Sequence, residues 1–252
     1  MFNIVEEIAH SDYRWKIVAN HIESPEIDHR PDLARYPKDD PQAKAAYNRK
    51  VKRPDDPNIA RCAWAWMSSY IEVKNDVENS GFYFGERDAD GNFLFLQEKD
   101  ESKPARAQFI KYATEAMLRQ HRTHYYSIYM SGMSVRVFRW DRVGCISTEP
   151  IDLKKDYKTF LNLLHRLATA EDDYGTDKTV ERATAAEILP IRHFKTKNEH
   201  LEEYREMMLD DLDAYPIYKV MESISVLAAL YSLGLLGQVS CSLRRWHRHR
   251  RR

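Results

Sequence analysis

The sequence predicts an α+β (mixed α/β) protein, with a small central sheet flanked by helices and with helical N- and C-terminal extensions. Segments with the apolar spacing of helices alternate along the chain with short apolar runs typical of strands, and no internal repeat is present. Of the 252 residues, 43% are hydrophobic and 12% aromatic. This composition is sufficient for a buried core and excludes collagen-like and disordered chains.

The first 61 residues predict a helical segment followed by a loop. Apolar residues recur at helical spacing between Phe2 and Ile22, so we expect helix within residues 1–23. Residues 24–61 contain six of the ten prolines together with many charges, which predicts a long proline-rich loop.

Residues 62–190 are expected to form the α/β core. The expected elements are a strand over 62–73, a helix begun by Ser102 and Pro104, strands over 125–130 and 133–140 joined at Ser131–Gly132, a strand from Cys145, and a helix capped by Asp156. The order of helices and strands is typical of an α+β or mixed α/β domain.

The end of the chain differs from the core in composition. Residues 191–219 predict a helical approach to a further domain, and residues 220–252 an apolar helix with an arginine-rich tail. The stretch 223–241 has nineteen uncharged residues, close to the shortest membrane-spanning helix. A spanning helix, a helix packed on the domain and a sequence that is not natural coding sequence are the three alternatives.

The formal net charge of zero is a sum over two unlike parts. Six arginines lie among the last nine residues, so residues 1–243 hold 33 basic and 39 acidic groups, a net charge of −6. An acidic body argues against a large nucleic-acid-binding face. The arginine tail could bind nucleic acid, direct nuclear import or lie beneath a membrane.

Cysteine content and the N-terminus predict an intracellular protein, cytoplasmic or nuclear. Cys62, Cys145 and Cys241 are far apart, which indicates neither a disulfide framework nor a zinc site. The first seven residues are acidic and do not resemble a signal peptide.

Candidate catalytic residues gather at the end of the 62–73 strand. Glu72 and Lys74 share one strand face because side chains i and i+2 point the same way. Asp32 and Glu72 could hold a divalent metal through carboxylate oxygens, and Lys74 could stabilise charge on a phosphate. Gln108 and Tyr112, four residues apart, share a helix face that could cover the site. The structural alternative is that Glu72 and Lys74 form a solvated or mutually paired strand end.

From Asp32 to Tyr112 the chain resembles the PD-(D/E)xK nuclease superfamily, in its variant with a Gln-x-x-x-Tyr helix. The resemblance implies Mg²⁺ held by Asp32 and Glu72, catalysis by Asp32, Glu72 and Lys74, and support from Gln108 and Tyr112. The separation between Asp32 and Glu72 is long for the superfamily and is filled by the proline-rich insert.

A second pattern covers more of the chain. Its residues, in order, are Pro31–Asp32–Leu33, Glu72, Lys74, Tyr112–Ala113, Gln120, Arg122, Gly132, Arg136, Asp141–Arg142, Gly144, Ser147, Gly175 and Asp177. In this pattern the chain is similar to the amino-terminal region of the fungal-type protein kinases, which implies serine/threonine phosphotransfer and ATP for a full-length member.

The phosphotransfer motifs of a kinase are not found in this sequence. No G-x-G occurs among the eight glycines, and Asp141–Arg142–Val143–Gly144 is not a D-F-G. We therefore expect a truncated member that ends before the kinase lobes, has no competent kinase site and needs no cofactor, and serves as a regulatory or interaction module. Its expected partner is a protein or the missing kinase lobe; the alternative is the nuclease.

Two further groups of residues favour ordinary structural roles. His121 and His124 could share a metal, but a solvated helix end is preferred because no third ligand is suggested nearby. Tyr125, Tyr126 and Tyr129 could stack on nucleobases, but core packing of a strand is preferred.

Overall fold

The computed structural model describes residues 12–23, 28–49, 51, 56–75, 78, 80–169, 175–212 and 216–220. The chain divides into two compact units, which we call the sheet unit (residues 1–177) and the C-terminal unit (residues 178–252). The apolar stretch 223–241 and the arginine tail lie outside the described residues. Within the described part, no helix is long and apolar enough to cross a membrane.

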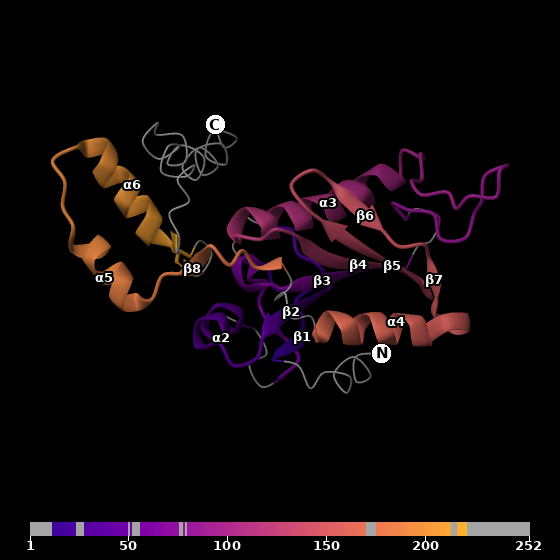
Figure 1. Ribbon diagram of the computed structural model, residues 1–252, viewed down its shortest axis with the longest axis horizontal. Helices are drawn as coiled ribbons and strands as arrows, with labels where there is room; N and C mark the ends of the chain where they lie inside the picture. The colour runs from indigo at the N-terminus through magenta and orange to yellow at the C-terminus, as the bar shows by residue number, and fades with distance from the viewer. Residues whose placement is uncertain are drawn as a thin grey trace. The chain divides into compact units, whose positions relative to one another are not determined.

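The sheet unit contains a seven-stranded mixed sheet (Figure 1). Its elements are β1 (Tyr13–Ile17), β2 (Leu33–Pro37), α2 (Pro41–Asn48), the 3-10 helix η1 (Trp64–Trp66), β3 (Ser69–Lys74), α3 (Ser102–Arg119), β4 (Tyr125–Ser131), β5 (Ser134–Trp140), β6 (Cys145–Ser147), β7 (Ile151–Asp152) and α4 (Leu153–Ala168). The mixed α+β class is confirmed.

The strands lie in the order β1-β2-β3-β4-β5-β6, and β7 pairs with β5. β1, β2 and β3 are antiparallel neighbours. β3 and β4 are parallel, so the chain must cross over between them, and α3 forms that crossover. The remaining pairs are antiparallel.

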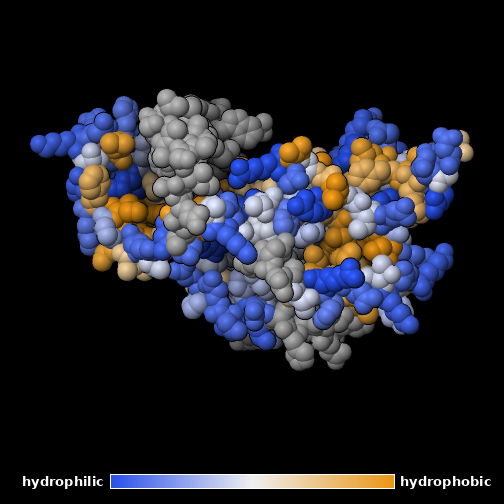
Figure 2. All heavy atoms as spheres, viewed as in Figure 1, coloured by the Kyte–Doolittle hydropathy of each residue, from blue (hydrophilic) through white to orange (hydrophobic). Residues whose placement is uncertain are grey.

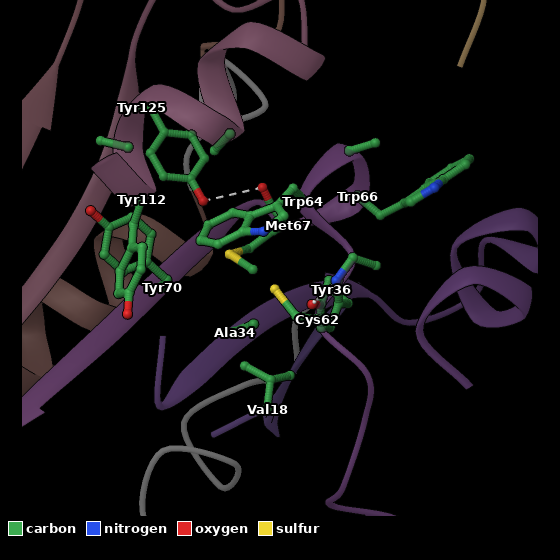
Figure 3. Packing of buried hydrophobic residues seen from close by; sticks show 14 of the residues in the cluster. Val18, Ala34, Tyr36, Cys62, Trp64, Trp66, Met67, Tyr70, Tyr112 and Tyr125 are labelled. Atoms are coloured by element: carbon green, nitrogen blue, oxygen red, sulfur yellow. Dashed lines mark hydrogen bonds between the residues drawn. The ribbon is translucent and has the colours of Figure 1, made fainter. Parts of the chain in front are cut away.

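Aromatic side chains fill the side of the sheet that α3 covers (Figure 1). Figure 3 shows Tyr70, Tyr112 and Tyr125 gathered around Trp64, with other labelled core residues such as Met67 beside them. Buried tyrosines need partners for their hydroxyl groups. The Tyr70 hydroxyl donates to the carbonyl of Phe109 (2.7 Å), and that of Tyr125 to the carbonyl of Met67 (3.2 Å). These bonds fix α3 and η1 against the sheet.

The side of the sheet that α4 covers is mainly aliphatic. Phe160 and Leu164 of α4 pack with Ile128, Val135 and other buried residues of the sheet. This apolar packing positions α4 by shape and burial.

The C-terminal unit contains two helices and a two-stranded sheet. Its elements are β8 (Val180–Arg182), α5 (Ala185–His193), α6 (Glu199–Asp210) and β9 (Tyr218–Val220), with β8 and β9 antiparallel. Thr184 and Glu187 form a reciprocal capping box at the start of α5. The helical interpretation of residues 191–219 is thus confirmed for α6, whereas residues 218–220 form a strand.

Two expectations for the first 61 residues are wrong. Residues 13–17 form a strand rather than a helix, because their backbone pairs with β2. The proline-rich segment 24–61 contains both β2 and α2. Pro41 does not prevent a helix because it lies in its first turn, where Asp40 accepts the N–H groups of Gln42 and Ala43. The expected helix over residues 2–11 lies outside the described residues.

Most later elements are confirmed, with different caps and bounds. Residues 64–66 form η1, and the strand expected over 62–73 begins at Ser69. Helix α3 begins at Ser102, but its hydroxyl donates to Gln97 (3.0 Å) and does not cap the helix. Helix α4 is capped by Asp152, four residues before the expected Asp156.

Candidate functional site

The end of β3 carries Glu72 and Lys74 side by side. The Nζ atom of Lys74 lies 2.6 Å from Oε1 of Glu72. Glu72 is only 3% exposed, whereas a quarter of the Lys74 side chain reaches solvent. The expected ion pair is therefore present, but its carboxylate is buried and the strand end is not simply solvated.

Asp32 lies beside this pair despite its distance in sequence. It directly precedes β2, whose Leu33 pairs with Ile71 of β3. Oδ2 of Asp32 accepts the backbone N–H of Val73 at 2.8 Å. The insert between β2 and β3 contains α2 and η1, and it leaves the pairing of the two strands intact. The long separation therefore does not prevent Asp32 and Glu72 from sharing a site.

Helix α3 adds Gln108 and Tyr112 to the same group. Oε1 of Gln108 accepts a hydrogen bond from Nζ of Lys74 at 2.8 Å, and its Nε2 donates to the Tyr112 hydroxyl. The amine of Lys74 is thus held from two sides, by Glu72 and Gln108. All five predicted site residues lie together where β2, β3 and α3 meet.

Burial controls the protonation of this site. Burial raises the pKa of Glu72 to about 7, although Lys74 lowers it; the charge of the nearby Asp32 raises this pKa and the backbone of Asp32 lowers it. Burial also raises the pKa of the Tyr112 hydroxyl, and the charges of Glu72 and Asp32 act in the same direction. Glu72 is therefore a carboxyl group that can gain or lose its proton near neutral pH.

The carboxylates suit a hard divalent cation. Oε2 of Glu72 is buried and has no hydrogen-bond partner among the described residues. An unpaired buried carboxylate oxygen is costly unless a cation or proton compensates it. No group of three or more His, Cys, Asp or Glu in the described part could hold a metal. Asp32 and Glu72 are the two carboxylates here that could hold Mg²⁺, with water or substrate oxygens as the other ligands.

An open pocket of about 660 Å³ adjoins the site. Its lining consists of Val73, Lys74, Asn75, Glu101, Pro104, Ala105 and Gln108. Our sequence reasoning missed Asn75, Glu101, Pro104 and Ala105 as parts of the site. Helical spacing could have indicated Glu101 and Ala105, because they lie seven and three residues before Gln108 and so share its helix face.

A second buried ionic cluster was also missed. Arg119 of α3 pairs with both Glu23 and Glu115, and the latter lies 3.4 Å from the ring of His29. Glu23 additionally accepts the N–H of Trp64 at 3.1 Å. Nothing in the sequence spacing brings Glu23 to Arg119, because 96 residues separate them.

Several residues of the kinase-like pattern hold the fold together. The amide group of Gln120 donates to the carbonyls of Trp64 and Met67, and its oxygen accepts from Arg122. The guanidinium of Arg136 donates to the carbonyls of Tyr83, Leu94 and Thr148. Gly132 lies in the tight turn between β4 and β5 with φ of 57°. These contacts give the residues structural roles, so no role in phosphotransfer is needed to explain their presence.

The remaining candidates have structural surroundings. His121 and His124 follow α3 rather than lying on it, and they belong to no metal-binding group of the described residues. The expected solvated helix end is wrong for His124, which is buried, whereas His121 is exposed. Tyr125 and Tyr129 are buried in the aromatic core. The preference for core packing of these tyrosines is confirmed.

Comparison with known proteins identifies one family. The family model described as fungal protein kinase matches residues 88–212, about half of the chain. The match includes Gln108 and Tyr112 but begins after Asp32, Glu72 and Lys74. No curated protein and no solved structure matches the chain. The chain belongs to the fungal protein kinase family.

Proposed function

We propose that the sheet unit cleaves phosphodiester bonds of nucleic acid with the help of a divalent cation. The buried, unpaired Oε2 of Glu72 carries this proposal, because it lies beside a second carboxylate and a fixed lysine. The topology supports it: β3 carries Glu72 and Lys74, Asp32 adjoins it through the antiparallel β2, and α3 leads from it to a parallel strand. This is the strand and helix context that the nuclease resemblance implies.

Each residue has a defined task in this proposal. Asp32 and Glu72 would hold Mg²⁺, which, when bound, polarises a phosphoryl oxygen and lowers the pKa of a water molecule. Lys74, oriented by Glu72 and Gln108, would face the phosphate and stabilise its growing negative charge. In hydrolysis a water oxygen bonds to phosphorus, one P–O ester bond breaks, and the departing oxygen takes up a proton.

Phosphotransfer by this polypeptide alone is not part of the proposal. The sequence has no G-x-G loop that could cover the phosphates of ATP, and no D-F-G that could hold its metal ions. We expect no magnesium-dependent ATP binding and no phosphorylation of a generic protein substrate.

The alternative function is a regulatory or interaction module. It is favoured by apolar side chains at the edge of the sheet, where Val143 is 99% and Ile146 68% exposed. Figure 2 shows that apolar side chains interrupt an otherwise largely hydrophilic surface. A protein partner could cover such residues, although isolated exposed apolar side chains are common in monomers.

A cleavage assay with matched variants tests the proposal. Purified protein is incubated with labelled single-stranded and duplex DNA in Mg²⁺, Mn²⁺ or EDTA. We expect metal-dependent cleavage that falls by about a hundredfold or more in Glu72→Gln, since loss of one electrostatic group at a reacting centre has effects of this size. Glu98→Gln, at an exposed position outside the site, should cleave like the wild type. Absence of cleavage with every metal, or full activity of Glu72→Gln, would reject the nuclease.

A further inference from the structure

We propose that the pocket beside Lys74 receives one unstacked nucleobase next to the phosphate, so that the substrate is single-stranded nucleic acid. This inference rests on the proposed nuclease function, because the pocket and the candidate site are continuous. Lys74 and Gln108 belong to both: they line the pocket and are hydrogen-bonded to each other. A phosphate placed at Lys74 would therefore have an adjacent nucleotide at the pocket.

The lining suits a flat, partly apolar group. Val73, Pro104 and Ala105 supply apolar wall, while Asn75, Glu101 and Gln108 supply polar atoms that could face the edge of a base. The volume of about 660 Å³ falls within the range of roughly 300–1,000 Å³ typical of small-molecule pockets. Sites that read an extruded base combine apolar contact with its faces and hydrogen bonds to its edge.

The charge of the pocket lining disfavours a second phosphate there. Glu101 and Lys74 both line the pocket, and Lys74 is already paired with Glu72. A neutral base can approach Glu101, whereas a second phosphate group beside it would be repelled. Long duplexes are usually held by many lysine and arginine contacts to phosphates, and Lys74 is the single lysine or arginine in this lining.

The same geometry favours a single-stranded nucleic acid over a duplex. In a duplex each base is stacked and paired, and it would have to be extruded at a cost before it could enter the pocket. A single strand avoids most of this cost. The acidic body and a nuclease site are then compatible, because the substrate would need one pocket and one phosphate position rather than a broad basic face.

Binding measurements without metal test the inference separately from catalysis. Fluorescence anisotropy in EDTA compares a labelled twelve-nucleotide DNA strand, the RNA strand of the same sequence and the DNA duplex. We expect either single strand to bind about tenfold more tightly than the duplex, because the duplex must first extrude a base at a cost of a few kcal/mol. Ala105→Trp should fill the pocket and remove this preference. Ala107→Trp is the matched control, because Ala107 is exposed on the same helix but does not line the pocket.

The possible outcomes separate this inference from the proposed function. Equal binding of strand and duplex, or a preference that survives Ala105→Trp, would overturn the inference even if metal-dependent cleavage is found. A single-strand preference that Ala105→Trp abolishes and Ala107→Trp retains would support the pocket. If no metal then permitted cleavage, the pocket would stand as a nucleic-acid-binding site and the nuclease function would fall.

Discussion

Two buried ionic clusters in the sheet unit differ in how completely their charges are paired. In the first, Arg119 pairs with two buried carboxylates, and Glu23 also accepts a backbone N–H. In the second, Lys74 pairs with Oε1 of Glu72, whereas the buried Oε2 has no hydrogen-bond partner among the described residues. A paired cluster holds elements together, whereas an unpaired buried carboxylate oxygen is costly unless a cation or a proton compensates it. We therefore propose that the first cluster is structural and the second functional.

The largest expected effect concerns the structural cluster. Arg119→Leu should reduce the free energy of unfolding by about 3–5 kcal/mol, because it leaves two buried carboxylates without their common cation. Urea denaturation followed by tryptophan fluorescence measures the change. Adding Glu23→Leu and Glu115→Leu to the Arg119→Leu protein should restore part of the loss. A loss below about 1 kcal/mol in the single variant would show that the cluster is not structural.

The stability that Glu72 contributes should depend on pH, and it should decrease as pH rises. The pKa of Glu72 is raised to about 7 in the folded protein, above its ordinary value of 4.5. Between these values the folded state keeps the proton and the unfolded state loses it, so stability falls as pH rises. This contribution is on the order of 3 kcal/mol between pH 4.5 and 7.

Glu72→Gln should remove this part of the pH dependence. Denaturation of both proteins at pH 4.5, 6 and 8 measures the difference, in which the contributions of other titrating groups cancel. The variant should gain stability relative to the wild type as pH rises, as expected when a functional site costs stability. Parallel pH profiles of the two proteins would contradict a raised pKa at Glu72.

Two tyrosine-to-phenylalanine variants should have smaller effects on stability. They distinguish a tyrosine that positions Gln108 from one that only supports the fold. Tyr112→Phe removes the hydroxyl that accepts from Gln108, and Tyr70→Phe removes the donor to the Phe109 carbonyl. Each should cost about 0.5–1.5 kcal/mol of stability, the usual contribution of one hydrogen bond. Cleavage by Tyr112→Phe should fall because Gln108 no longer has its fixed orientation toward Lys74. Equal cleavage by the two variants would show that Tyr112 has no positioning role.

The sequence predicted which residues lie together at the end of β3 better than it predicted the surrounding fold. Glu72 and Lys74 follow from strand alternation, and Gln108 and Tyr112 from helical spacing, which are local rules. Asp32 could be placed with Glu72 only through the resemblance, because the pairing of β2 with β3 is a tertiary contact across a long insert.

The errors have physical causes of the same kind. The helix expected over residues 13–17 is a strand, because β2 offers the backbone partners that local apolar spacing cannot indicate. The loop expected over residues 24–61 contains α2, because a proline in the first turn does not oppose a helix. The Glu23–Arg119 pair joins residues 96 positions apart, and no local pattern encodes it.

Metal binding tests the central claim most directly. Isothermal titration of the full chain with Mn²⁺, at pH 6 and pH 8, compares the wild type with Asp32→Asn and Glu72→Gln. We expect binding that strengthens with pH, because Glu72 must lose its proton, and that is lost or greatly weakened in both variants. Mn²⁺ binding that is absent from the wild type, or unchanged in Glu72→Gln, would rule out a metal site at Asp32 and Glu72.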